Sequence, residues 1–64
     1  MKNASQVYAA LLRIEVDGAY ASDLRRAISD ERQALHLAIA SKDASRINAC
    51  RDEAMRVMGL WGVL

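Results

Sequence analysis

The sequence predicts an all-α fold in which a short N-terminal helix precedes an antiparallel helical hairpin. The chain of 64 residues has no proline and three glycines, so little interrupts helix formation. Hydrophobic residues make up 53% of it and include two Tyr, one Trp and no Phe, a composition typical of closely packed helices. These residues recur at spacings of three and four, the period of an amphipathic helix.

The first helix is predicted at about residues 4–17. Asn3, with Gln6 three residues later, resembles a capping box, in which each side chain bonds the backbone of the other residue. The Asp17-Gly18 pair supplies a C-terminal stop. The apolar residues between these signals follow at helical spacing and are Val7, Ala10, Leu11 and Ile14.

The second and third helices are predicted at about residues 22–41 and 44–60. Ser22 is a good N-cap and is followed by acidic Asp23, while Asp43 can cap the third helix. The third helix carries an apolar seam with alternating spacings of three and four residues, formed by Ile47, Cys50, Ala54, Val57, Trp61 and Leu64.

The break between these helices is only "SKDAS", so they are expected to fold back as an antiparallel hairpin. Residues whose numbers sum to about 85 then lie opposite each other. In this register Leu35 faces Cys50, Ile28 faces Val57 and Met58, and Leu24 faces Trp61. The indole of Trp61 is expected to anchor the core there, and contact with a partner protein is the alternative. Every layer is apolar on both sides except the one in which Glu31 meets Ala54.

Glu31 needs water, a partner or a proton, because burying an unpaired carboxylate costs several kcal/mol. One interpretation pairs it with Arg51, or with an arginine of a second chain, so that the pair sets the register of the seam. The other places Glu31 in a groove where a lysine or arginine of a partner protein docks.

A chain this short is near the lower limit for burying a sufficient core alone, which predicts self-association as a homodimeric bundle. The first helix also carries a second apolar side, with Leu12 and Val16 turned away from Val7 and Leu11. We expect this side, together with the open side of the hairpin, to form either the dimer contact or a binding surface for another protein.

The net charge of +1 excludes a field strong enough to imply nucleic acid or an anionic membrane on its own. One cysteine cannot form an internal disulfide, which fits a reducing compartment. Neither a signal peptide nor a run of roughly 18 apolar residues is apparent, so a cytoplasmic protein without membrane contact is expected.

The sequence offers little for catalysis, and we predict neither an enzyme nor a cofactor or metal site. His36 is the only imidazole, and no acidic residue three or four positions away orients it. Cys50 belongs to the apolar seam, so we expect it to be a buried structural thiol. Gly-rich phosphate loops and metal-ligand spacings are also missing.

A basic stripe of Arg25, Arg32 and His36 supports an alternative, a small DNA-binding repressor with a helix-turn-helix. In that interpretation "SDLRRAI" is the first helix, "SDE" the turn and "RQALHLAIA" the recognition helix. The missing turn glycine, the acidic Asp30 and Glu31 and the low net charge count against it. The stripe otherwise forms a solvated face balanced by Asp23 and Asp30.

The layout of a short helix followed by "SDLRRAISDERQALHLAIASKDASRINACRDEAMRVMGLWG" resembles, in size and helix order alone, the small helical phage-encoded antagonists of host regulators, of the anti-quorum-sensing type. The resemblance implies binding to a host transcription regulator and transfers no site residues.

We therefore predict a non-catalytic regulator or inhibitor that occludes a surface of a larger cytoplasmic protein. A structural assembly subunit is a further alternative. The predicted partner-binding residues are Tyr8, Leu12, Val16, Arg25, Glu31, Arg32 and Trp61.

Overall fold

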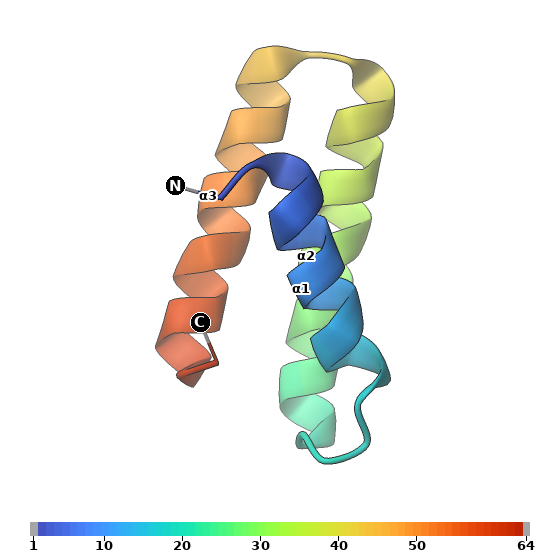
Figure 1. Cartoon of the computed structure of the whole chain (residues 1–64), viewed down its shortest axis with the longest axis vertical. Helices are drawn as coiled ribbons and strands as arrows, with labels where there is room; N and C mark the ends of the chain where they lie inside the picture. The colour runs from blue at the N-terminus through green and yellow to red at the C-terminus, as the bar shows by residue number, and fades with distance from the viewer. Residues whose placement is uncertain (1, 64) are drawn as a thin grey trace.

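The computed structural model describes residues 2–63 and contains three helices, α1 (Ala4–Val16), α2 (Ser22–Ser41) and α3 (Ala44–Trp61). The prediction of an all-α fold with three helices is confirmed, and the observed bounds lie within one residue of the predicted ranges. Helices α2 and α3 form the antiparallel hairpin, and α1 packs against both of them (Figure 1). Although α1 is the shortest helix, its 13 residues make more than three turns. Leu64, the last residue of the predicted seam, lies outside the described residues.

The predicted caps of α1 and α3 are confirmed by hydrogen bonds. The backbone N–H of Gln6 donates to Asn3 Oδ1 at 2.9 Å, and the backbone N–H of Asn3 donates to Gln6 Oε1 at 2.9 Å. Asp43 Oδ1 accepts from the backbone N–H groups of Ser45 and Arg46. Each cap satisfies N–H groups that the helix itself leaves without an acceptor.

The prediction that Ser22 caps α2 is wrong by one residue. Ala21 is the N-cap and provides no side-chain hydrogen bond, while Ser22 is the first helical residue. The reason lies in the backbone, because the N–H of Arg25 donates to the carbonyl of Ala21 at 3.0 Å and so starts the helical ladder one residue earlier.

Two residues in the left-handed region end the long helices. Lys42, with φ of 59°, ends α2, and Gly62, with φ of 72°, ends α3. Beyond Gly62 the chain turns back, since the N–H of Val63 donates to the carbonyl of Met58 at 3.0 Å. This is the bonding pattern of a Schellman motif, and it brings the half-buried Val63 against the core.

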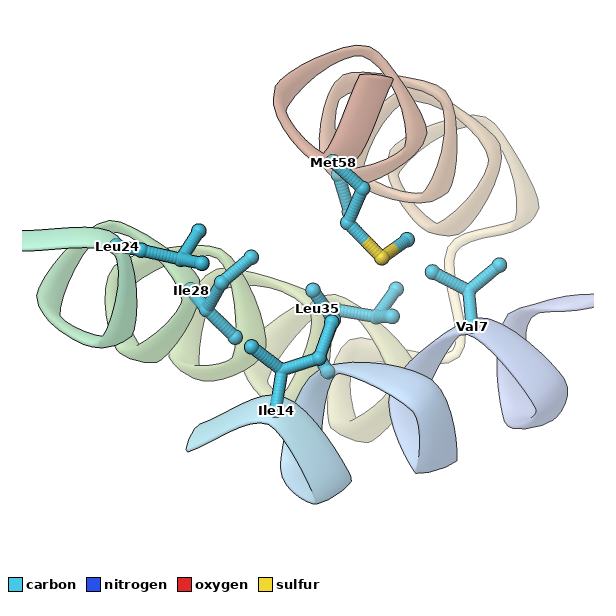
Figure 2. Packing of buried hydrophobic residues seen from close by; sticks show 8 residues of the cluster. Val7, Ile14, Leu24, Ile28, Leu35 and Met58 are labelled. Atoms are coloured by element: carbon cyan, nitrogen blue, oxygen red, sulfur yellow. The ribbon is translucent and has the colours of Figure 1, made fainter. Parts of the chain in front are cut away.

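The core lies where the three helices meet and is made of aliphatic side chains and one thioether. Figure 2 shows Met58 reaching from α3 toward Val7 of α1 and Leu35 of α2. Among the described residues no aromatic side chain is fully buried. The buried core residues are Val7, Leu11, Ile14, Leu24, Ile28, Leu35, Ala38, Ala54 and Met58.

The prediction that Trp61 anchors the core opposite Leu24 is wrong, because the Trp61 side chain is 46% exposed and does not belong to the core cluster. The predicted seam treats α3 as facing α2 alone. Since α1 also packs on α3, the buried side of α3 is centred on Ala54 and Met58, and Val63 takes the place at the end of the core. No helix of the described chain has both the length and the apolar composition needed to cross a membrane.

Candidate protein-binding surfaces

A polar cluster holds α1 on α2 and involves two of the predicted partner-binding residues. The guanidinium of Arg32 forms an ion pair with the Glu15 carboxylate, and Arg32 Nη2 donates to Glu15 Oε1 at 3.3 Å. Arg32 Nη1 also donates to the Tyr8 hydroxyl at 3.4 Å, a long contact. Arg25 Nε donates to the backbone carbonyl of Glu15 at 3.2 Å, where the last turn of α1 leaves carbonyls unpaired.

Glu15 is the residue that sequence reasoning missed. The hydrogen bond from Arg32 lowers the pKa of the Glu15 carboxyl despite its partial desolvation, and Ser29 adds a second donor. The same bond raises the pKa of Arg32. Glu15 lies seven residues after Tyr8, and Arg32 lies seven after Arg25, so each pair shares a helix face. The spacing shows only which residues share a face of each helix, because the pairing of the two faces depends on how α1 docks on α2.

Arg25, Arg32 and His36 therefore do not form a free basic stripe. Glu15, rather than the expected Asp23 and Asp30, balances Arg32. The imidazole of His36 lies beside the ring of Tyr8, with centroids 6.2 Å apart and a tilt of 40°. The turn required at residues 29–31 for a helix-turn-helix is also missing, since α2 is continuous through this segment.

Helix α1 presents an apolar ridge to solvent, which we call the α1 stripe: Tyr8, Leu12 and Val16. Leu12 is 42% exposed and Val16 is 71% exposed, while Tyr8 is half-buried beside α2. An open pocket of about 280 Å³ adjoins the N-terminal end of the stripe and is lined by Ser5, Tyr8, His36 and Ile39. The structure therefore confirms that α1 is apolar on two sides.

Glu31 is half-buried on the other flank of α2, at the level of Glu53 and Arg56 of α3. This placement agrees with the predicted hairpin register. Desolvation raises the pKa of the Glu31 carboxyl, and the negative charge of Glu53 raises it further, whereas Arg56 acts in the opposite direction. Within residues 2–63, Glu31 has no ion-pair partner within 4.0 Å.

The predicted pair between Glu31 and Arg51 is wrong. Arg51 Nη2 donates instead to Asp52 Oδ1 at 3.0 Å. Helical spacing explains the difference, because Arg51 lies on the opposite side of buried Ala54 from Glu53 and Arg56. The cation near Glu31 is Arg56, whose guanidinium already binds the Glu53 carboxylate.

The last turn of α3 forms a second exposed apolar surface, which we call the Leu60–Trp61 surface after its two residues. Leu60 is 73% exposed and Trp61 is 46% exposed. Leu60 lies one turn after Arg56 and two turns after Glu53, so the Arg56–Glu53 ion pair borders it. Of the predicted partner-binding residues, Glu31 and Trp61 lie toward this part of the hairpin, whereas Tyr8, Leu12 and Val16 form the α1 stripe.

Residues 2–63 contain no group of three or more His, Cys, Asp or Glu side chains that could hold a metal ion. Cys50 is a free, half-buried thiol next to the core. Within the described residues, the exposed large hydrophobic side chains outside the α1 stripe and the Leu60–Trp61 surface are Leu37 and Ile39 of α2. No protein-family model, curated protein or solved structure matches this chain.

Proposed function

We propose that this protein is a non-catalytic regulator or inhibitor that binds a larger protein and occludes part of that protein's surface. The observation that carries the proposal is the exposure of the chain's one tryptophan in a protein whose described core has no buried aromatic residue. A tryptophan buries a large area on contact and is enriched among residues that dominate binding energy. Leu60 extends the apolar contact beside it.

Charged residues border the Leu60–Trp61 surface and would orient a bound partner. Glu31, Glu53 and Arg56 carry two negative charges and one positive charge on the adjoining part of the hairpin. Charges at the rim of an interface affect partner choice and association rate more than affinity. We therefore retain Glu31 and Trp61 as partner-binding residues. Arg25 and Arg32 instead hold α1 against α2.

The DNA-binding alternative finds no specific support in this arrangement. A phosphate-binding surface needs cations that are free to contact the backbone of nucleic acid. Arg32 is neutralised by Glu15, and Arg25 donates to a carbonyl of α1. A structural assembly subunit remains an alternative. The target of an assembly subunit needs this protein to fold or assemble, whereas the target of a regulator or inhibitor exists without it.

A pull-down from a nuclease-treated bacterial lysate tests the proposed function. The baits are the tagged wild type, Trp61→Ala, Leu60→Asp and the control Leu37→Asp. Leu37 is 64% exposed and, in the hairpin register, lies about 18 Å along the bundle from Leu60. Circular dichroism confirms that each bait is folded.

We expect one protein, with a transcription regulator as the first class to look for, to be retained by the wild type and by Leu37→Asp and lost with the other two baits. Titration of that purified protein should then show a stoichiometric complex whose formation blocks one of its activities. A result in which Trp61→Ala and Leu60→Asp retain the same proteins as the wild type would overturn the proposal.

A further inference from the structure

We propose that the α1 stripe is the contact surface between two copies of this chain, which pack around a two-fold axis through Leu12. Tyr8, Leu12 and Val16 are spaced by four residues and so form one ridge of the helix surface. Tyr8 and Val16 each lie about 6 Å along α1 from Leu12. A two-fold axis at Leu12 therefore exchanges the two ends of the ridge, as a self-complementary interface requires.

The ends of the ridge have complementary shapes. When the two α1 helices run antiparallel around this axis, Val16 of each copy lies opposite Tyr8 of the other. Val16 projects furthest into solvent, with 71% of its surface exposed. The open pocket of about 280 Å³ between Tyr8, Ser5, His36 and Ile39 lies at the other end of the stripe. The branched side chain of Val16 can thus fill the pocket of the second copy.

The charges around the stripe favour a second copy over a charged partner. Glu15 and Arg32, which lie between the stripe and α2, neutralise each other within one chain. Burying the stripe against itself therefore leaves no new unpaired charge at the centre of the contact. Arg13 lies on the next ridge outward and is exposed, so in the dimer it occupies the solvated rim.

The available area indicates a weak and reversible dimer. A standard stable interface buries about 800 Å² per partner, which would be close to a fifth of the 4164 Å² surface of this chain. Helix α1 is only about 20 Å long, so a contact made by α1 and the adjoining residues of α2 falls below that size. We expect a dissociation constant in the micromolar range.

The dimer does not depend on the proposed function. What does rest on the proposed function is the number of target-binding surfaces that the dimer carries. The Leu60–Trp61 surface lies at the end of α3 and is not part of the α1 stripe. The dimer would consequently carry two target-binding surfaces and would hold a dimeric target more tightly than a monomeric one.

Sedimentation equilibrium across a range of concentrations tests the dimer on the purified full chain. We expect wild type and Leu37→Asp to dimerise within about twofold of each other, because Leu37 lies on the face of α2 opposite Leu35. Val16→Asp would remove the apolar contact of Val16 and bring a charged carboxylate of each copy into the buried contact, and it should weaken dimerisation by at least about tenfold. Val16 is exposed, so this variant should retain its helical circular dichroism spectrum.

Disulfide cross-linking locates the two-fold axis. With Cys50→Ser removing the native thiol, Leu12→Cys should form a covalent dimer under mild oxidation, whereas Leu37→Cys should not. A wild-type chain that stays monomeric up to about 1 mM would overturn the inference. So would a dimer that Val16→Asp leaves unchanged, because it would use another surface. A monomer that still captures a target through Leu60 and Trp61 would contradict this inference and leave the proposed function standing.

Discussion

Arg32 of α2 and Glu15 of α1 form an ion pair that spans seventeen residues of sequence and joins the N-terminal helix to the hairpin. Because α1 supplies Val7, Leu11 and Ile14 to the core, the position of α1 decides whether that core closes. The pair therefore lies at the border of the contact on which the fold depends, and it withdraws Arg32 from any role at a free basic surface.

Replacing Glu15 with Gln should lower the free energy of unfolding at neutral pH and have little effect in acid. The pKa of Glu15 is lowered in the folded protein, so its carboxylate adds stability above its unfolded-state pKa and loses it as the pH falls through the folded-state value. Urea unfolding of wild type and Glu15→Gln at neutral and acidic pH measures this. An equal difference between the two proteins at every pH would contradict the assignment.

Replacing Glu31 with Gln should have the opposite effect on the free energy of unfolding at neutral pH. Desolvation and Glu53 raise the pKa of Glu31, so the folded protein favours the protonated carboxyl and loses that stability as the pH rises through the folded-state value. Glu31→Gln should accordingly be more stable than wild type at neutral pH, by a small margin that disappears in acid. Thermal unfolding monitored by circular dichroism provides the comparison, and a less stable variant at pH 7 would show that Glu31 has a favourable partner.

Truncation of Leu11 should lower the stability of the protein far more than truncation of its neighbour Leu12. Leu11 is fully buried, so Leu11→Ala should cost about 2 to 5 kcal/mol of unfolding free energy through lost burial and a cavity. A domain this small has only about 3 to 5 kcal/mol of core stabilisation, so the variant should be largely unfolded. Leu12→Ala is the matched control and, at a protein concentration low enough for the chain to be monomeric, should change the stability by no more than about 0.5 kcal/mol. Similar losses at both positions would mean that the buried side of α1 is assigned incorrectly.

The two helix ends with positive φ should respond in opposite directions. Lys42→Gly should stabilise the protein by up to about 1 kcal/mol, because glycine adopts the left-handed conformation without the steric cost of a Cβ atom. Gly62→Ala should destabilise it by about 1 kcal/mol for the same reason. Chemical denaturation of both variants tests this pair, and the same sign at both sites would contradict the backbone assignment.

Local signals in the sequence predict most of the fold. The Asn3 and Gln6 capping box, the Asp43 cap and the short break before α3 depend on residues close together in the chain, and all three are confirmed. The placement of Trp61 fails because the predicted seam counts only two helices, whereas the third helix and the turn at Gly62 decide which side chain reaches the core.

The polar contacts were harder to predict, because they too depend on how the three helices pack together. Glu15 and Arg32 meet only once α1 has docked at a particular angle, which no local pattern specifies. Likewise, whether Glu31 lies nearer Arg51 or Arg56 depends on which side of α3 faces the hairpin partner. The sequence did locate the second apolar side of α1, since Leu12 and Val16 follow from helical spacing alone.

The most direct test of the proposed function is a titration of the captured target protein with Leu60→Asp and with Leu37→Asp, each compared with wild type. Both variants introduce one carboxylate at an exposed leucine, so they differ only in position. We predict that Leu37→Asp binds like wild type and that Leu60→Asp binds at least about tenfold more weakly. Equal affinities for the two variants would contradict the claim that the Leu60–Trp61 surface binds the target.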